Sequence, residues 1–399
     1  MYYPYFITDT SRLDGLKNCN EPALYPASKF FNLLIALIIA SLALVLSGCQ
    51  PVTLADDDTG NTSDKTAVLY VYNWSEYMPK QILENFEAET GIKVIYGTYE
   101  SNEQMYNQVT HSTSAPYDLI VPSTYYVKKM SQEGLLQPID KAKLTNFVQL
   151  NPALIHTKID PNNNYSVPYL WGTTGIAVDA KTVNAASIRH WRDLWQPQFK
   201  GQVLLTNDMR EVFGMALLAL GYSSNSENAQ EIKLAYESLV KLMPHVVGFE
   251  SQAPRLPYMS GVANIGMIWN GEAVMANRAG MSSLHYIYPA EGTLLWIDSF
   301  AIPKGARHVE AAHQFINFVL RSENAQIISR NLGYATPNLG ARMFMSPATK
   351  ANTTIYPTAE VLKKAELQTN VSPHALSIYQ YYWDQLKQQW QNGHHQLAS

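Results

Sequence analysis

The chain has 399 residues, of which 46% are hydrophobic and 16% are charged, and its formal net charge is -4. This length corresponds to about two or three compact units with ample apolar core, and the composition excludes a disordered chain. The charge balance argues against a nucleic-acid-binding protein, because such proteins carry basic patches.

The first feature along the chain is an uncharged apolar run, FFNLLIALIIASLALVL, at residues 30–46. It is short for a membrane span and fits the apolar region of a secretory signal, although an uncleaved membrane anchor is the alternative. The run leads into LSGC, which resembles a bacterial lipobox and predicts a lipoprotein signal peptide at 1–48 and lipidation of Cys49. Residues 49–66 are polar and acidic and predict a flexible tether. With Cys19 removed, the mature chain has no disulfide and no four-cysteine zinc site.

Strands and helices then alternate along the chain. Short apolar runs predict strands at 67–72, 93–96, 117–121, 175–178, 202–205, 265–268 and 294–302. Apolar residues at helical spacing predict helices at 79–90, 103–111, 191–195, 210–220, 229–243, 272–279, 309–320 and 325–331. This alternation predicts an α/β fold with parallel sheets that helices cover on both faces.

Two extended segments interrupt the alternation and predict crossings between lobes. The segment at 165–171 contains Pro168, which is poor for a central strand, and the segment at 296–303 ends at a proline. We therefore expect two lobes, each with a mostly parallel sheet, that are hinged by the crossings around a ligand cleft. The expected parts are 67–168 and 298–345 for one lobe, 169–297 for the other, and 346–399 for a C-terminal helical part packing mainly on the second lobe.

The sequence contains no GxGxxG after a strand, P-loop, HExxH or GxSxG motif, so no motif-bearing enzyme class is favoured. Aromatic residues instead stand beside carboxylates or hydroxyls at predicted strand ends. Trp74-Ser75-Glu76-Tyr77 follows the first strand, and Ser123-Thr124-Tyr125 follows the strand that ends at 121. Ligand loops of α/β sheets lie at such ends, although capping of the core is the alternative for Trp74 and Tyr77.

Three carboxylates stand out in the second half of the chain. Asp208 and Glu211 fit a capping box at a helix start, which the pattern alone favours over two carboxylates aimed at a cation. Asp298 shares a strand face with Trp296 and Phe300, so its charge needs a partner, either an arginine or a bound cation. Aromatic faces combined with carboxylates complement an elongated organic cation.

On these residues the sequence resembles the periplasmic spermidine/putrescine-binding proteins of ABC transporters. The matching segments include YNWSEYMP, YDLIVPSTYYVKKM, LTNDMREVF, PYMSGVANIGMIWNGEA, LWIDSFAIP and GYATPNL. The resemblance runs from Leu69 to Trp390 and implies two α/β lobes that close on a polyamine. It implies spermidine as the preferred ligand, putrescine as a second one, and neither a cofactor nor a metal.

The resemblance also implies roles for individual residues. It implies an aromatic wall made of Trp74, Tyr77, Tyr125, Trp269, Trp296 and Tyr334. It implies that the ammonium groups are bound by Glu76, Asp208, Glu211 and Asp298. It implies polar contacts from Ser123, Ser251 and Gln368. Ser75 stands where spermidine-preferring members have a threonine, which keeps the hydroxyl but weakens the expected preference for spermidine.

The expected function is a monomeric receptor in the periplasm, lipid-anchored to a membrane, that delivers a polyamine to an ABC permease. A sensor that docks on a membrane signalling receptor is the alternative, and neighbouring permease and ATPase genes would favour transport. An enzyme acting on polyamines is disfavoured, because the sequence offers no positioned nucleophile and base.

Overall fold

The computed structural model of the protein describes residues 67–111 and 117–395. The predicted signal peptide, lipidation site and tether lie outside these residues. No helix of the described ranges is both long and apolar enough to cross a membrane.

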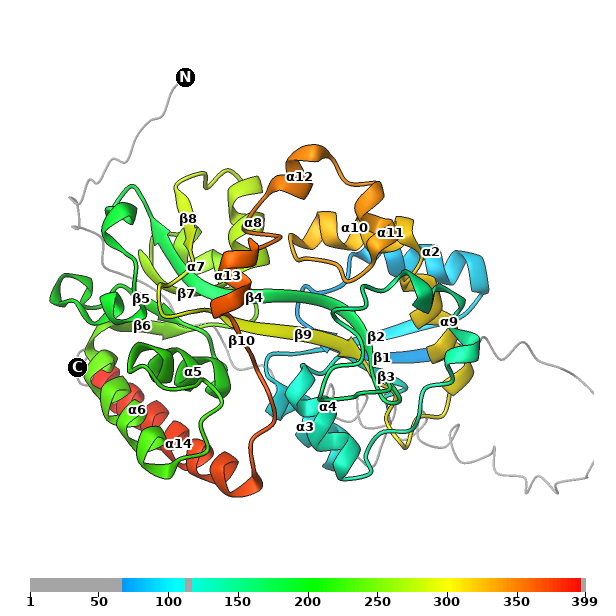
Figure 1. The fold of residues 1–399 in the computed structure, drawn as a ribbon, viewed down its shortest axis with the longest axis horizontal. Helices are drawn as coiled ribbons and strands as arrows, with labels where there is room; N and C mark the ends of the chain where they lie inside the picture. Colours follow the sequence, from blue (N-terminus) through cyan, green and yellow to red (C-terminus); the bar gives the residue numbers. More distant parts are fainter. Residues whose placement is uncertain (1–66, 112–116, 396–399) are drawn as a thin grey trace, which may run out of the picture. The chain divides into compact units, whose positions relative to one another are not determined.

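The described residues form an α/β fold (Figure 1). The strands are β1 (Val68–Trp74), β2 (Lys93–Tyr99), β3 (Leu119–Ile120), β4 (Val167–Asp179), β5 (Val203–Leu205), β6 (Val246–Phe249), β7 (Ile265–Trp269), β8 (Leu284–Ile287), β9 (Leu294–Phe300) and β10 (Glu366–Leu367). The α-helices are α2 (Lys80–Thr90), α3 (Asn102–His111), α4 (Thr124–Gln132), α5 (Met209–Ala219), α6 (Ala229–Leu242), α7 (Arg255–Met259), α8 (Asn270–Arg278), α9 (Val309–Val319), α10 (Ser322–Leu332), α11 (Leu339–Met343), α12 (Pro347–Ala351), α13 (Ala359–Lys364) and α14 (Pro373–His395).

The first lobe is built on a parallel sheet with the strand order β2-β1-β3. Helix α2 buries Ile82 and Phe86, and the Phe86 ring lies edge-on at 5.0 Å from Phe315 of α9. The helix ends at Gly91, whose φ of 70° lies in the left-handed region that glycine adopts at low cost. The apolar spacing that predicted this helix is therefore the face that packs on the first lobe's core.

The second lobe contains a larger sheet with the order β10-β9-β4-β7-β5-β6, to which β8 adds by pairing with β4. The prediction of a mostly parallel sheet is wrong for this lobe, because β4 is antiparallel to β7, β8 and β9. All residues of β4 are buried. A strand that is buried on both faces shows no alternation of apolar and polar residues, so its sequence carries no information about the direction of its neighbours.

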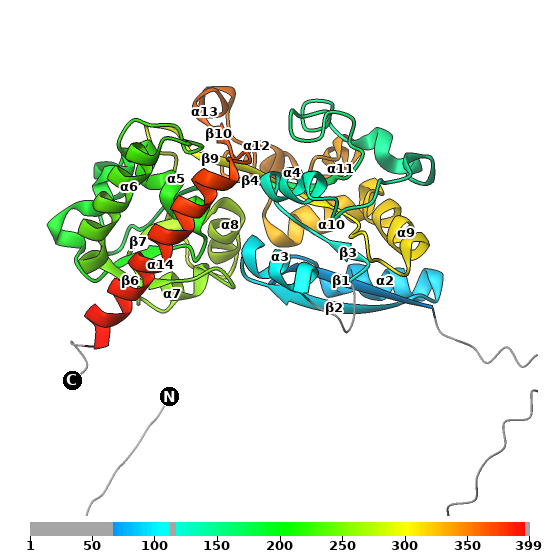
Figure 2. The same ribbon diagram turned by 90° about the horizontal axis from the view of Figure 1, so that it is seen from below.

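Strands β4 and β9 connect the two lobes and run side by side between them (Figure 1 and Figure 2). Val167 and Phe300 belong to the core of the first lobe, whereas Ile176 and Leu294 belong to the core of the second. The predicted crossing at 165–171 and the predicted strand at 175–178 are therefore one strand. Pro168 is accommodated because the ladder with β9 shifts register between Pro168 and Leu170.

Other predicted elements differ in type or extent. The helix predicted at 191–195 is a 3₁₀ helix, Trp191–Trp195. Helix α4 directly after β3 was not predicted, although most of its first turn is buried, including Tyr125, Tyr126 and Val127.

The C-terminal helix α14 packs on α5 and α6 of the second lobe (Figure 1). Tyr379 and Leu386 belong to the core of that lobe, and Tyr382 stacks on Tyr236 of α6 at 4.6 Å. The segment that leads into α14 contains β10, which pairs with β9, and the Gln368 carbonyl oxygen after it accepts a hydrogen bond from Thr124 Oγ1 of the first lobe at 3.1 Å, so the segment contacts both lobes.

Gly172 lies where the lobes meet, opposite Trp296 in the β4–β9 ladder. A Cβ atom at Gly172 would lie 2.3 Å from Asn270 Oδ1 and 2.6 Å from the Trp296 ring. We expect Gly172→Ala to lower the free energy of unfolding by about 1–3 kcal/mol, the usual cost of overpacking. Urea unfolding of the ligand-free protein measures this free energy. Gly248→Ala is the control, because a Cβ atom at Gly248 would have its nearest neighbouring atom 3.8 Å away. Equal losses in both variants would contradict the expectation.

Candidate ligand-binding site

The first lobe contributes the loops that follow β1 and β3. Because parallel strands end at the same edge of a sheet, these loops lie together. The Trp74 indole N–H donates to the carbonyl oxygen of Val121 at 3.0 Å and so joins the end of β1 to that of β3. The next residues turn sharply, and Glu76 has a φ of 50°, an uncommon conformation for a residue with a side chain. The turn gives Tyr77 a buried position beside the crossing strands.

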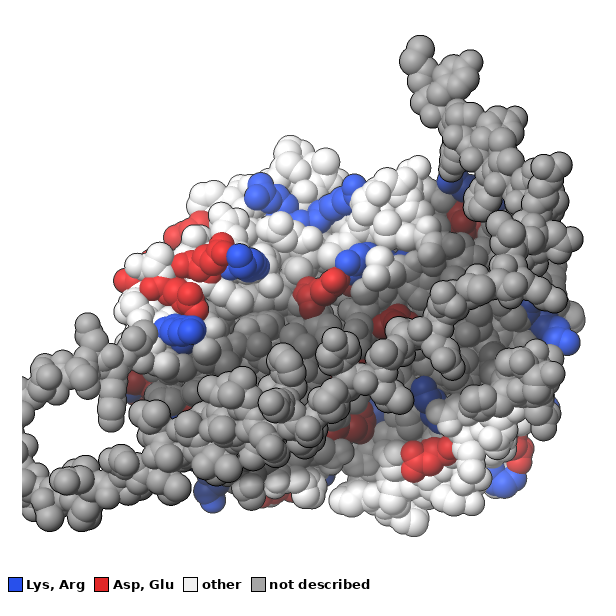
Figure 3. All heavy atoms as spheres, turned by 180° about the vertical axis from the view of Figure 1, so that it is seen from behind, with Lys and Arg blue, Asp and Glu red and all other residues white. Residues whose placement is uncertain are grey.

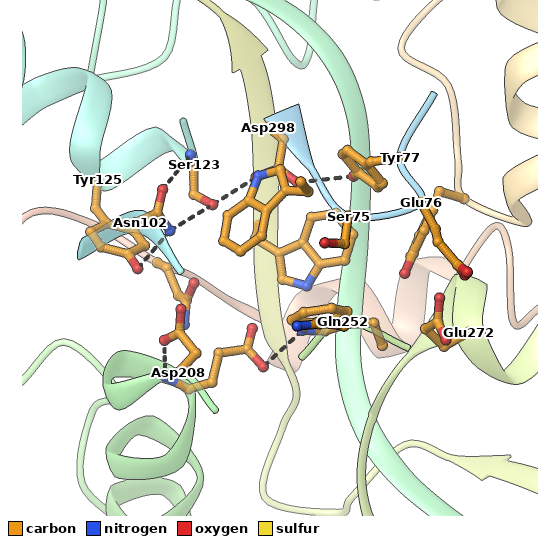
Figure 4. Close-up of a pocket in the computed structure, with 16 residues that line it drawn as sticks. Ser75, Glu76, Tyr77, Asn102, Ser123, Tyr125, Asp208, Gln252, Glu272 and Asp298 are labelled. Atoms are coloured by element: carbon orange, nitrogen blue, oxygen red, sulfur yellow. Dashed lines mark hydrogen bonds between the residues drawn. The ribbon is translucent and has the colours of Figure 1, made fainter. Parts of the chain in front are cut away.

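Strand β9 places Asp298 between the lobes, next to these loops (Figure 4). Its carboxylate accepts hydrogen bonds from Ser123 Oγ at 2.6 Å and from Tyr77 Oη at 2.9 Å. Asp298 is 5% exposed, and burial raises its pKa to about 7. No salt bridge joins Asp298 to a basic side chain among the described residues. The carboxylate is therefore held by neutral donors and keeps acceptor capacity for a cation.

The second lobe contributes Asp208 and Glu211 at the start of α5. Asp208 is the N-cap and accepts a hydrogen bond from the Glu211 backbone N–H at 3.0 Å. The Glu211 side chain accepts from Thr174 Oγ1 at 2.8 Å and from the Trp269 indole N–H at 3.1 Å. Burial and the neighbouring Asp208 raise the pKa of Glu211 to about 8. The predicted cap is confirmed for Asp208, whereas Glu211 turns toward the region between the lobes.

Aromatic rings from both lobes surround these carboxylates. Trp74 of the first lobe and Trp269 of the second lie edge to face at 6.1 Å. The Tyr334 ring lies 5.3 Å from Tyr77 and 5.5 Å from Trp296. Their faces can cover methylene groups and attract a cation.

All of the ligand-binding residues predicted from the sequence except one meet in one cavity between the lobes (Figure 4). It contains about 510 Å³ of space not filled by atoms, part of which is open to solvent. Its predicted lining residues are Trp74, Ser75, Glu76, Tyr77, Ser123, Tyr125, Asp208, Glu211, Trp269, Trp296, Asp298, Tyr334 and Gln368.

Ser251 is not among the lining residues. Its buried hydroxyl oxygen instead accepts a hydrogen bond from the Asn207 backbone N–H at 2.8 Å. Ser251 thus holds the loop that presents Asp208. The contact of Ser251 with the ligand was implied by the family resemblance alone, and a resemblance between sequences does not distinguish a hydroxyl that faces the ligand from one that holds the loop beside it.

Asn102, Gln252 and Glu272 also line the cavity and were not predicted. Asn102 donates to Ser123 Oγ at 3.2 Å and to Tyr125 Oη at 3.0 Å, and so fixes two of the predicted residues. Its position just after β2, at the edge where the other loops lie, was the available signal. Gln252 hydrogen-bonds Glu100 of the first lobe.

Glu272 belongs to an ion-pair group at one end of the cavity. Arg255 of the second lobe donates to Glu76 Oε2 at 2.6 Å and to Glu272 Oε2 at 3.0 Å. Glu76 belongs to the first lobe, so this arginine bridges the lobes.

No group of three or more His, Cys, Asp and Glu side chains in the described part of the chain could hold a metal ion.

The family model described as bacterial extracellular solute-binding protein matches residues 81–358 of the chain. The chain belongs to this family. A solute-binding protein of two lobes accounts for a cavity whose walls come from both of them.

Curated relatives of this solute-binding protein cover most of its length. It is 50% identical over 325 residues to the spermidine/putrescine-binding periplasmic protein of Escherichia coli (strain K12). This match covers 82% of this chain and 93% of the relative. It is 37% identical over 360 residues to spermidine/putrescine-binding periplasmic protein 1 of Haemophilus influenzae. This match covers 90% of this chain and 99% of the relative.

Solved structures confirm the two-lobed fold of the solute-binding protein. The spermidine/putrescine ABC transporter substrate-binding protein PotD from Streptococcus pneumoniae is 34% identical, with a TM-score of 0.68, and the match covers 81% of this chain and 99% of PotD. The lipoprotein TpPotD of Treponema pallidum is 30% identical, with a TM-score of 0.71, and the match covers 80% of this chain and 99% of TpPotD.

Proposed function

We propose that the protein is an extracytoplasmic receptor that binds a polyamine between its lobes and delivers it to an ABC permease. Spermidine is the preferred ligand, and putrescine is the second. The observation that carries this proposal is the buried Asp298 carboxylate, which lies among aromatic rings and, among the described residues, accepts side-chain hydrogen bonds only from the neutral hydroxyls of Ser123 and Tyr77. A buried carboxylate of this kind is costly without a counter-charge, and an ammonium group supplies one.

The ligand acts through contacts with both lobes. Asp298 and Tyr77 approach it from the side of the first lobe, whereas Asp208, Glu211 and Trp269 approach it from the second lobe. A cation that touches both sets stabilises the closed arrangement over the open one, because only the closed arrangement makes all the contacts. The closed form is then the form that the permease recognises. The role is binding and delivery, without chemical change of the ligand.

The proposal includes the place of the protein in the cell. Names of the relatives place them in the periplasm, and one solved relative is a lipoprotein. We propose a periplasmic monomer that is anchored through lipid on Cys49 after removal of residues 1–48. Residues 49–66 then act as the tether, and the chain crosses between the lobes near 168 and 297, within β4 and β9.

A thermal-shift panel on the purified chain without its signal peptide tests the proposed ligand class. The panel contains spermidine, putrescine, spermine, a sugar and an amino acid. We expect the melting temperature to rise with the polyamines in a concentration-dependent way, since a ligand that binds only the folded state stabilises it. A melting temperature that rises with the sugar or the amino acid and with none of the polyamines would contradict the proposal.

A further inference from the structure

At one end of the cavity the protein supplies a cation of its own. Arg255 is the first residue of α7, and its guanidinium donates to Glu76 from one nitrogen and to Glu272 from another. Its backbone N–H also donates to Glu272 Oε2, at 3.2 Å. Glu272 therefore holds both the start of the helix and the side chain, so the guanidinium points at Glu76 across the boundary between the lobes.

Among the ion pairs of the described residues, Arg255–Glu272 is the one in which both side chains are largely buried. The side chains of Arg255 and Glu272 are only 16% and 5% exposed, and both Glu76 and Glu272 line the cavity. A guanidinium is always charged in proteins and matches carboxylates in a fixed fork geometry. The two carboxylates at this end therefore already have a counter-ion.

At the other end of the cavity, no basic side chain of the described residues forms an ion pair with a carboxylate, although burial raises the pKa of Asp208 and the charge of Arg210 partly offsets this rise. Asp298, Asp208 and Glu211 form no salt bridge with a basic side chain in the described part of the chain. The nearby Arg210 donates to Thr369, Ser224 and Asn225 rather than to these carboxylates. Ammonium groups of a ligand thus find free carboxylates at one end and an occupied pair at the other.

We propose that Arg255 determines polyamine selectivity by occupying, as a resident cation, the Glu76 and Glu272 end of the cavity. The proposal rests on the proposed polyamine-binding function and adds a selectivity residue to it. A ligand ammonium group reaches Glu76 only in competition with Arg255. Ligands with few ammonium groups lose little by this competition, whereas longer ligands lose the contact for an additional group. Arg255 thereby disfavours the tetraamine spermine relative to the diamine putrescine.

The test compares dissociation constants for putrescine, spermidine and spermine by calorimetry in the wild-type protein and its variants. In Arg255→Gln we expect the affinity for spermine relative to putrescine to rise about tenfold or more, the size of one charge-assisted contact. In Glu272→Gln the remaining Glu76 charge is fully compensated by Arg255, so we expect this ratio to fall. Arg321→Gln removes an arginine that pairs with Glu89 outside the cavity and should leave the ratio at its wild-type value.

The outcomes separate this proposal from the function on which it rests. If the wild-type protein binds no polyamine, the proposed function fails. If it binds them and Arg255→Gln weakens all of them by the same factor, Arg255 is only a latch between the lobes and the selectivity proposal is overturned. Arg255→Lys keeps the positive charge, so its affinity for spermine relative to putrescine should stay near the wild-type value. If this relative affinity in Arg255→Lys instead equals that in Arg255→Gln, the selectivity proposal is also overturned. Opposite shifts in Arg255→Gln and Glu272→Gln support the proposal.

Discussion

Asp298→Asn should weaken spermidine binding more than tenfold while the protein remains folded. The substitution keeps the shape of the side chain and an acceptor oxygen for one of the two hydroxyls, Ser123 or Tyr77, but it removes the charge that pairs with an ammonium group. A hydrogen bond to a charged group contributes about 1.5–3 kcal/mol, which corresponds to a loss of about tenfold to a hundredfold in affinity. Isothermal titration calorimetry measures the loss, and we expect a similar one for Glu211→Gln.

The matched control is Asp384→Asn, the same chemical change at an exposed position on α14. Asp384 pairs with Gln380 on its own helix and does not line the binding cavity. We expect affinity within about twofold of wild type, because a distant exposed charge is screened by solvent and salt. Wild-type affinity in both Asp298→Asn and Glu211→Gln would show that the ligand binds elsewhere.

Binding should release protons, and affinity for polyamines should rise with pH up to about pH 8. Burial raises the pKa of Asp298 to about 7 and that of Glu211 to about 8 in the ligand-free protein, so both carboxyls are largely protonated at lower pH. An ammonium group favours the ionised form, so the protons must leave when the ligand binds. Below these pKa values we expect the association constant to rise about tenfold per pH unit for each proton released.

The ligand-free protein should show the opposite trend in stability. The pKa values of Asp298 and Glu211 are higher in the folded protein than the roughly 4 of an unfolded chain. Their contribution to the free energy of unfolding is therefore fully present below about pH 4 and is lost as the pH rises through about 7 and 8. Urea unfolding at several pH values measures the free energy of unfolding of the ligand-free protein. For the binding prediction, titration calorimetry in buffers of different ionisation enthalpy counts the protons that are released when the polyamine binds. A binding enthalpy that is independent of the buffer would contradict the proton release.

Much of the site could be predicted because its residues lie next to strand ends that the sequence makes visible. Trp74 and Ser123 stand at or just after short apolar runs that predict strands, and the parallel strands β1 and β3 bring their carboxyl ends to one edge. Asp298 instead lies within the predicted strand at 294–302, where a carboxylate on an apolar face stands out. The aromatic residues beside them indicated an organic cation before any contact between the lobes was known. The resemblance to a known family then turned Asp208 and Glu211 from a helix cap into candidate ligands.

The contacts between the lobes could not be predicted in the same way. Glu76 and Arg255 are 179 residues apart, and nothing local in either segment indicates that they meet. Glu272 lies in the first turn of α8, where an acidic residue is common and does not by itself indicate a binding site. The direction of β4 was also hidden, because a strand buried on both faces has no alternation from which its neighbours can be inferred.

The most direct test of the central claim is a crystal structure of the protein grown with spermidine. We predict one spermidine between the lobes, with amine nitrogens about 2.7–2.9 Å from carboxylate oxygens of Asp298 and Glu211. Its methylene groups should lie on the rings of Trp296 and Trp269. Spermidine bound outside this cavity, or a cavity filled by a solute without an amine, would contradict the claim.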